Sequence, residues 1–256
     1  MRNPIPYVAA VAALGLAGCG GLETLGNADT LANLAQAGGT AAKAAFLSDS
    51  EIKTLSDQSC AESDSKSQVA DANSPYTVRL NKVMQPMPAS INGQPVNYKV
   101  YLSKDVNAWA MANGCIRVYS GLMDAMTDDE LRGVLGHEAG HVALGHSKKA
   151  VQVAYSATAA RQVAGPAGGI ASTLSKSQLG DMTEKLVNAQ FSQSQESAAD
   201  DYAFDLLTQR KLPREGLVTG FEKLAKSDSG QPSLFSSHPP PAERAARMRQ
   251  RLAGAK

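Results

Sequence analysis

The sequence predicts an α+β fold that is mostly helical, with a small β-sheet flanking one central helix. Three observations predict it: a capped helical pattern opens at Thr127, a second helical pattern covers residues 194–210, and apolar and polar residues alternate from Val96 to Leu102. The 256 residues are 43% hydrophobic and 19% charged, an ordinary globular composition that is large enough for one sizeable core. The formal net charge of +1 gives no argument for a nucleic-acid partner.

The first residues are predicted to direct and anchor the chain. Residues 1–18 resemble a bacterial lipoprotein signal peptide, because Arg2 precedes an apolar run, Ile5 to Ala17, that is too short to span a membrane as a mature helix. The run ends in Leu16-Ala17-Gly18-Cys19, which resembles a lipobox, so Cys19 is expected to carry lipid. An ordinary secretory peptide with a chance cysteine is the alternative.

Gly20 follows Cys19, so the aspartate that usually retains such proteins at the inner membrane is missing. We therefore expect a bacterial cell-envelope protein, lipid-anchored at the outer membrane with its folded part in the periplasm. Residues 19–48 are expected to form the lipidated N-terminus and a tether, although their leucine and alanine spacing also fits a weak helix. Residues 49–256 are expected to form one domain.

Two cysteines remain once Cys19 is lipidated. Cys60 follows a helical pattern that starts at Ser50, and Cys115 lies in the predicted strand region. In an oxidising compartment such a pair favours a disulfide, with two buried free thiols as the alternative. The bond would staple the N-terminal helix to the strands and stabilise the fold by about 3–4 kcal/mol.

A hairpin is predicted directly before the central helix. Asn107–Ala110 and Cys115–Tyr119 are separated by Asn113-Gly114, a strong two-residue turn signal. We expect this pair to form the edge of the small sheet.

The central helix carries the pattern H-E-x-x-H at residues 137–141. His137 and His141 are one helical turn apart, so both imidazoles can reach one tetrahedral Zn²⁺. Glu138 lies about 100° further round the helix, where it can meet a zinc-polarised water rather than the metal. That arrangement indicates metal-assisted hydrolysis of an amide bond, with Glu138 as general base and acid. The alternative is a helix that contains these residues by chance.

Other residues of the same helix refine this prediction. Gly133, Gly136 and Gly140 share a face, which indicates close approach of another backbone, and Gly145 is a C-terminal stop signal. His146 lies five residues beyond His141, about 140° off the metal face, and is expected at the surface or beside a ligand rather than as a ligand.

A third zinc ligand is predicted on the second helix. Glu196 would complete a His₂Glu site, and Asp200, one turn on, would accept a hydrogen bond from a histidine N–H. A solvated acidic face is the alternative. The small residues 197–199 suit close packing on the glycine face of the first helix.

These elements resemble the HtpX/Oma-type gluzincin zinc metallopeptidases, most closely their bacterial LoiP-like lipoprotein branch. The resemblance extends to four further stretches: Leu55–Gln58, Asn92–Tyr101, Asn107–Met123 and Gln190–Leu207. It implies a zincin-like endopeptidase with one catalytic Zn²⁺, acting on membrane-associated or misfolded proteins. The family's zinc histidines fall on His137 and His141, its glutamate ligand on Glu196 and its catalytic glutamate on Glu138, without departure.

The resemblance also suggests how substrate binds. An edge strand in such enzymes holds an extended polypeptide by main-chain hydrogen bonds, and we assign this role to Asn107, Ala108, Trp109 and Ala110. A simple core hairpin with Trp109 buried is an equally good interpretation of this segment, and both can hold. The resemblance places His238, in a proline-rich loop, near the cleft. There it would stabilise the oxyanion or reach the zinc in a closed state, with a surface turn capping the next helix as the alternative. Tyr202 is a weaker candidate for the same role.

Two C-terminal regions carry less information. Residues 150–194 have a helical pattern at both ends and a break at Gly165–Gly169. They are expected either to form a mobile helical pair that covers the site or only to pack against the rest of the domain. The arginines of the last helix are expected to form a solvated face, with a contact to anionic lipid as the alternative. They are Arg244, Arg247, Arg249 and Arg251.

The sequence therefore predicts a zinc endopeptidase that hydrolyses peptide bonds of unfolded, misfolded or membrane-associated envelope proteins. The rival is a latched or weakly active metalloprotein that serves as a chaperone or scaffold for outer-membrane protein assembly, with envelope assembly machinery as partner. Glu138 argues against a purely structural site, because such sites are usually closed by four protein ligands. A permanent fourth ligand from His238 would favour the rival.

Overall fold

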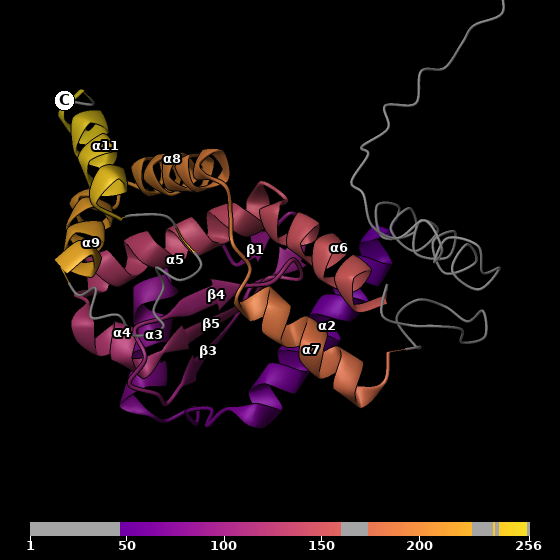
Figure 1. Cartoon of the computed structure of the whole chain (residues 1–256). Coiled ribbons are helices and arrows are strands. Elements are labelled where there is room, and N and C mark those ends of the chain that lie inside the picture. Colours follow the sequence, from indigo (N-terminus) through magenta and orange to yellow (C-terminus); the bar gives the residue numbers. More distant parts are fainter. Residues whose placement is uncertain (1–46, 160–173, 227–237, 239–240, 255–256) are drawn as a thin grey trace, which may run out of the picture.

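Helix α5 (Asp128–Ala143) is the element around which the others pack in the computed structural model (Figure 1). The structure describes residues 47–159, 174–226, 238 and 241–254. Helix α8 (Gln193–Gln209) lies along α5, helix α9 (Glu215–Lys226) packs against the N-terminal part of α5, and the strands lie on another side of it (Figure 1). The fold is α+β and mostly helical, as the sequence predicts.

The sheet has three strands in the order β3-β5-β4. Strand β3 (Asn97–Tyr101) pairs in parallel with β5 (Cys115–Tyr119), and β4 (Ala108–Ala110) pairs antiparallel with β5 on its other side. The expected hairpin is thus confirmed, with β4 at one edge of this sheet. Gly114 adopts φ +83° at the turn, and a Cβ there would lie 2.6 Å from the Pro95 carbonyl oxygen, so the position requires glycine. A separate hairpin joins β1 (Ser90–Ile91) to β2 (Gln94–Pro95).

The glycines of α5 allow its neighbours to approach closely. A Cβ on Gly133 would lie 2.8 Å from Leu217 Cα of α9, and one on Gly140 would lie 2.9 Å from the Ala199 carbonyl oxygen of α8. At Gly136 the nearest atom would be an ordinary 3.5 Å away. The expected backbone approach is therefore confirmed at two of the three glycines. The contact at Gly140 holds α8 close to the part of α5 that carries His137 and His141.

A second layer contains helices α2 (Asp49–Lys66), α6 (His146–Ala159) and α7 (Lys176–Val187), which pack on one another. Leu47 is buried among them and Ser48 caps α2, so the folded domain includes both residues. A disulfide joins Cys60 of α2 to Cys115 of β5, with Cα atoms 6.7 Å apart. The predicted staple between helix and strands is confirmed.

The remaining described elements are α3 (Pro75–Met84), α4 (Ser120–Ala125) and α11 (Pro241–Gly254). Both α3 and α4 contribute to the main core, and α11 packs on α9 and α8. The expected helices at both ends of residues 150–194 are present, while the expected break at Gly165–Gly169 lies outside the described residues. Cys19 and the predicted signal peptide also lie outside them. Among the described helices, none has the length and apolar character needed to cross a bilayer.

Candidate metal centre

Two buried helices present the candidate ligands. Thr127 and Glu130 form the predicted reciprocal capping box at the start of α5, and the helix ends before Gly145, which has φ +75°. This fixed span places His137 and His141 on one face, both about 1% exposed. On α8, a capping box at Ser192 starts the helix one turn before Glu196, which is 2% exposed. The solvated-face interpretation of Glu196 is therefore wrong.

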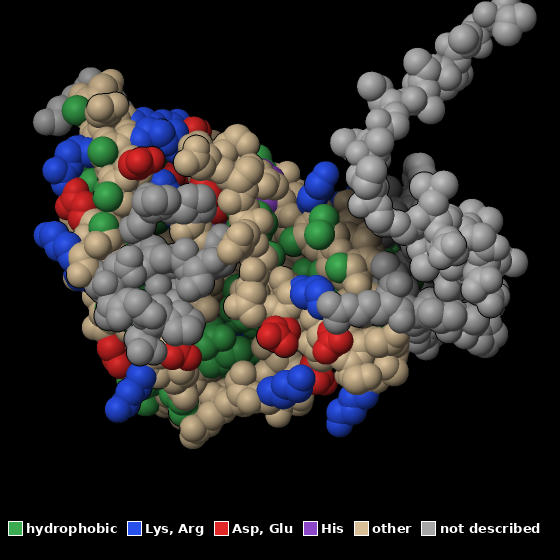
Figure 2. All heavy atoms as spheres, in the orientation of Figure 1, with side chains coloured by type: hydrophobic (Ala, Val, Ile, Leu, Met, Phe, Trp, Pro, Cys, Tyr) green, Lys and Arg blue, Asp and Glu red, His purple; other side chains and the backbone are tan. Residues whose placement is uncertain are grey.

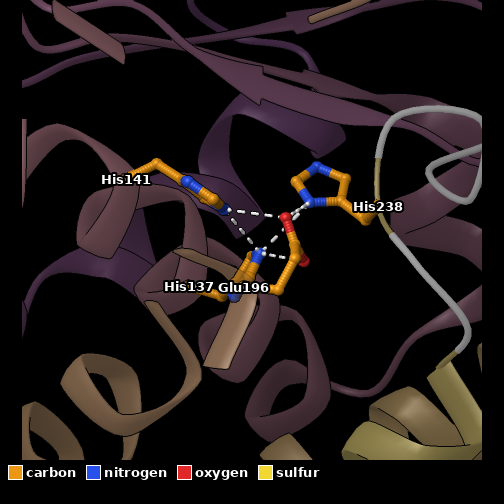
Figure 3. Close-up of side chains that lie close together, drawn as sticks. All are labelled: His137, His141, Glu196 and His238. Atoms are coloured by element: carbon orange, nitrogen blue, oxygen red, sulfur yellow. Dashed lines mark hydrogen bonds and ion pairs between the residues drawn. The ribbon is translucent and has the colours of Figure 1, made fainter. Parts of the chain in front are cut away.

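Four side chains converge at one point (Figure 3). His141 Nε2 lies 3.1 Å from His137 Nε2 and 3.3 Å from Glu196 Oε1. His238 Nδ1 lies 2.7 Å from Glu196 Oε1 and 3.4 Å from His137 Nε2. The candidate ligand atoms of all four residues lie within 4.8 Å of one another. Of the groups described, these can hold one metal ion.

The charges at this cluster favour a cation. Burial lowers the pKa of His137 well below its usual range and that of His141 to about 4, so both imidazoles are neutral at pH 7. Burial alone would raise the pKa of Glu196, but hydrogen bonds from His141 and His238 outweigh it and lower that pKa. Neutral imidazole nitrogens and an ionised carboxylate are the donors that Zn²⁺ prefers. The donor set therefore fits zinc.

Glu138 differs from the other carboxylate. It is 2% exposed, and its Oε1 has no hydrogen-bond partner among the described residues; His238 Nε2 is 3.7 Å away. Burial raises the pKa of Glu138 to about 7. A carboxyl that titrates near neutrality can both accept and return a proton, which is what a general base and acid requires.

Each histidine of α5 has a second contact through its outer nitrogen. His137 Nδ1 lies 2.8 Å from Asp200 Oδ1, the contact expected for Asp200, which is fully buried. His141 Nδ1 lies 3.1 Å from Nδ1 of His146, which is half-buried. A hydrogen bond to the outer nitrogen fixes the tautomer whose Nε2 lone pair faces the cluster. His146 thus lies beside a candidate ligand, one of the two placements expected for it.

Comparison with known proteins identifies the family. Residues 76–252 match the family model described as Peptidase family M48. The chain belongs to peptidase family M48. It is 56% identical over 238 residues to Metalloprotease LoiP of Escherichia coli (strain K12), covering 93% of this chain and 92% of that protein. It is 54% identical over 215 residues to Metalloprotease YcaL of the same organism, covering 84% and 85%. Protease HtpX of Shewanella loihica matches over 50 residues at 46% identity, covering 18% and 17% of the two chains.

This M48 peptidase is a zinc-dependent metalloprotease, and the predicted resemblance is confirmed. Nothing in the comparisons supports the rival scaffold function.

The M48 centre includes one charged residue that sequence reasoning placed wrongly. Arg244 was expected on a solvated face, but its side chain is only 9% exposed. Its Nε and Nη2 donate to the two carboxylate oxygens of Asp200, at 3.0 and 2.6 Å, and its Nη1 lies 3.0 Å from Glu196 Oε2. The guanidinium also stacks over Phe221, 4.2 Å from the ring centroid. The expectation holds for Arg249, which is 63% exposed. It is wrong for Arg247 and Arg251, which are 35% and 32% exposed and both pair with Asp201 of α8.

Two further residues were only partly placed by the sequence. His238 is 4% exposed and reaches the cluster, so the surface-turn alternative is wrong. The ring of Phe191, for which the sequence predicts no role, stacks on His141 with centroids 3.9 Å apart. Phe191 lies in the connector before α8, where no sequence pattern indicates this contact. Tyr202 is half-buried, packs against the hydrophobic core and is not part of the four-residue cluster.

The predicted substrate strand β4 is at the sheet edge, and Trp109 within it is 5% exposed, so the core hairpin with Trp109 buried is confirmed, while the role in binding substrate stays a prediction. Hydrogen bonds between Asn107 O and Tyr119 N, and between Met111 N and Cys115 O, flank the β4–β5 pair. Because hydrogen-bonded and non-bonded positions alternate in antiparallel pairs, the backbone groups of Ala108 and Ala110 point away from β5. The Ala110 carbonyl accepts a bond from Ser147 Oγ at 3.1 Å.

Proposed function

We propose that this M48 peptidase hydrolyses extended segments of unfolded or misfolded envelope polypeptides, with His137, His141 and Glu196 as the zinc ligands. The convergence of these three buried side chains on one point carries the proposal. Their Nε2 and carboxylate atoms all face inward, while Asp200 and His146 contact the outer nitrogens of the two histidines. A His₂Glu set leaves one coordination position for chemistry.

Zinc bound there would lower the pKa of a water ligand and polarise the substrate carbonyl. Glu138 would accept the proton of the attacking water and return it to the leaving amine. Its carboxylate oxygen has no hydrogen-bond partner among the described groups, and its pKa of about 7 suits both transfers.

His238 is proposed as the fourth ligand of a closed state rather than as a permanent structural ligand. Its Nδ1 faces Glu196 and His137 at 2.7 and 3.4 Å, and its Nε2 faces Glu138. With His238 there, the position needed for the attacking water is taken. Substrate binding would have to displace His238 from the metal. The displaced His238 imidazole could then donate a hydrogen bond to the developing oxyanion.

Substrate is proposed to bind as an added strand on β4. The Ala108 carbonyl and the Ala110 N–H point away from β5 on that edge and would pair with the substrate, while Trp109 is buried and supports the strand from within. Asn107 would close one end of the segment, since its side-chain oxygen already accepts from Ala108 N–H at 2.8 Å.

The cellular setting is proposed from the sequence. Cys19 would be lipidated after removal of residues 1–18, the residues between Cys19 and Leu47 would form the tether, and the domain, which includes Leu47 and Ser48, would work in the periplasm at the outer membrane. Contact with envelope assembly machinery remains part of this proposal.

Metal removal tests the proposal. Mature protein lacking Cys19 would be incubated with an unfolded test protein, after chelation and after titration with Zn²⁺. We expect cleavage to disappear on chelation and return with one equivalent of zinc. Absence of cleavage despite bound zinc would favour the scaffold, and cleavage that persists after zinc removal would contradict a zinc peptidase.

A further inference from the structure

The last turn of α5 carries one of the candidate zinc ligands. His141 lies two residues before the end of the helix at Ala143. The last carbonyl groups of a helix have no partner within it, and helix ends fray more readily than helix centres. The Leu144 and Gly145 N–H groups each donate back to a carbonyl of this turn. The Ala143 carbonyl is bonded from another part of the chain.

The β1–β2 hairpin supplies that bond. Asn92 Nδ2 donates to the Ala143 carbonyl oxygen at 3.0 Å and to the Val142 carbonyl oxygen at 3.4 Å. Asn92 and Gly93 are the two residues between the strands, and both have positive φ, +50° and +76°. That combination is typical of a type I′ turn, in which asparagine is favoured. Asn92 therefore serves both the turn and, through its amide donor, the end of α5.

The hairpin is anchored beside the same part of α5. Ile91 is 5% exposed and forms a buried cluster with Ala139 and Val142 of α5. Ala110, the last residue of β4, packs against this cluster. One small cluster thus joins the hairpin, the metal-binding part of α5 and the end of the proposed substrate strand. This apolar contact holds the Asn92 amide at the helix end.

The bonded carbonyls lie directly before the junction of α5 with α6. Gly145 has φ +75° and leads into α6, whose first residue is His146. His146 Nδ1 lies 3.1 Å from His141 Nδ1, so the direction in which the chain leaves α5 determines whether these two atoms meet. A bond that fixes the Ala143 carbonyl therefore stabilises both His141 and the residue that contacts its outer nitrogen.

The metal centre is buried, whereas Asn92 is exposed. His137 and His141 are about 1% exposed, and Figure 2 shows little histidine on the face that it views. Asn92 is not part of the four-residue cluster, and its exposed side chain can be replaced without opening a cavity in the core.

We infer that Asn92 is a positioning residue for the metal centre, which acts through the last turn of α5 on His141. The inference rests on the proposed function, because it takes His141 to be a zinc ligand. It extends the centre to a surface hairpin that contributes no ligand. A substitution at this hairpin should change zinc binding although every metal ligand is kept.

Two variants separate the Asn92 amide from the turn. Asn92→Gly keeps a residue that adopts positive φ freely but removes the donor. Asn92→Asp keeps the shape of the side chain and places a carboxylate against two carbonyl oxygens, at the negative end of the helix dipole. Asn113→Gly is the matched control at the second Asn-Gly turn, where Asn113 bonds to Asp57 and to the Cys115 N–H.

Zinc affinity of the mature chain would be measured by competition with a chelator. Hydrogen exchange of residues 139–146 in the zinc-loaded protein would report fraying of the helix end. The visible spectrum of the Co²⁺-loaded protein would report the geometry of the ligands, which a general loss of stability leaves unchanged. Denaturant unfolding of the same samples gives the stability lost in each variant.

We expect Asn92→Gly to bind zinc about 2- to 10-fold more weakly than wild type, the worth of one hydrogen bond. Asn92→Asp should bind zinc more weakly still, because repulsion is added to the lost bond. Both variants should exchange faster at residues 139–146 and change the Co²⁺ spectrum. Asn113→Gly should match wild type in all three measurements.

Wild-type zinc affinity in both Asn92 variants, or an equal loss of affinity in Asn113→Gly, would overturn the inference. A peptidase assay on the same samples separates it from the proposed function. Weaker zinc binding by the Asn92 variants, with no cleavage even by wild type, would uphold the role of Asn92 and refute the peptidase.

Discussion

Arg244 and Asp200 form a buried bidentate ion pair, called the fork here. Arg244 Nε donates to Asp200 Oδ2 at 3.0 Å, and Nη2 donates to Oδ1 at 2.6 Å. Asp200 Oδ1 also lies 2.8 Å from His137 Nδ1. One carboxylate therefore joins the C-terminal helix α11 to a candidate zinc ligand on α5. His238 lies six residues before Arg244 in the sequence, and both side chains contact Glu196.

Arg244→Ala should destabilise the protein by about 3–5 kcal/mol, because it leaves the Asp200 charge buried without its main partner. Denaturant unfolding measures this change. Arg249→Ala on the exposed side of the same helix is the control and should cost less than about 1 kcal/mol. If the Arg244 variant were no less stable than the Arg249 variant, the fork would have no structural importance.

His146→Ala should weaken zinc affinity by about 10- to 100-fold, because His141 would lose the acceptor that fixes its tautomer. His146→Asp supplies a carboxylate acceptor at the same place and should restore affinity. Competition with a chelator of known affinity gives the measurement, and Leu144→Ala, at a neighbouring 44% exposed side chain, is the control. Equal zinc affinity in all these proteins would show that His146 does not contribute to zinc binding.

His238→Ala should lower zinc affinity while raising the turnover of an unfolded protein several-fold, because it removes the proposed closing ligand and frees the position for water. The two effects have opposite signs, and a general loss of structure would lower both quantities. Steady-state kinetics beside a zinc competition assay would detect them. A fall in turnover with zinc affinity unchanged would instead favour a role limited to the oxyanion.

Glu138 should make the metal-free protein lose stability as the pH rises. Its folded pKa of about 7 exceeds the usual glutamate pKa of 4.5, so the folded state binds the proton more tightly than the unfolded state. That contribution is complete below pH 4.5 and is lost as the pH rises through 7. The free energy of unfolding of the metal-free Glu138→Gln variant should therefore exceed that of metal-free wild type by about 3 kcal/mol at pH 8, and the two values should converge near pH 4. Parallel stability–pH curves would contradict a buried, uncompensated carboxyl.

The sequence predicts those parts of the centre that depend on local spacing. The capping box at Thr127 and the i, i+4 spacing determine that His137 and His141 share a face, and these need no tertiary information. Gly133 and Gly140 reveal that a backbone packs on that face, since a helix bears the cost of glycine only for a reason.

The sequence fails where contacts depend on how distant elements meet. Arg244 belongs to a helix whose arginines look alike in sequence, and only the packing of α11 against α8 buries one of them beside Asp200. Phe191 lies in a connector without a periodic pattern, so nothing local indicates that its ring lies on His141. The parallel pairing of β3 with β5 likewise depends on the whole chain.

Zinc content and peptidase rate, measured on the same samples of wild type and Glu138→Gln, test the central claim most directly. We predict one zinc ion per chain in both proteins and a cleavage rate about 10²- to 10⁴-fold lower in the variant, because only the proton transfer is removed. Equal rates in the two zinc-loaded proteins would contradict the role of Glu138. Wild-type protein that binds no zinc would contradict the metal centre itself.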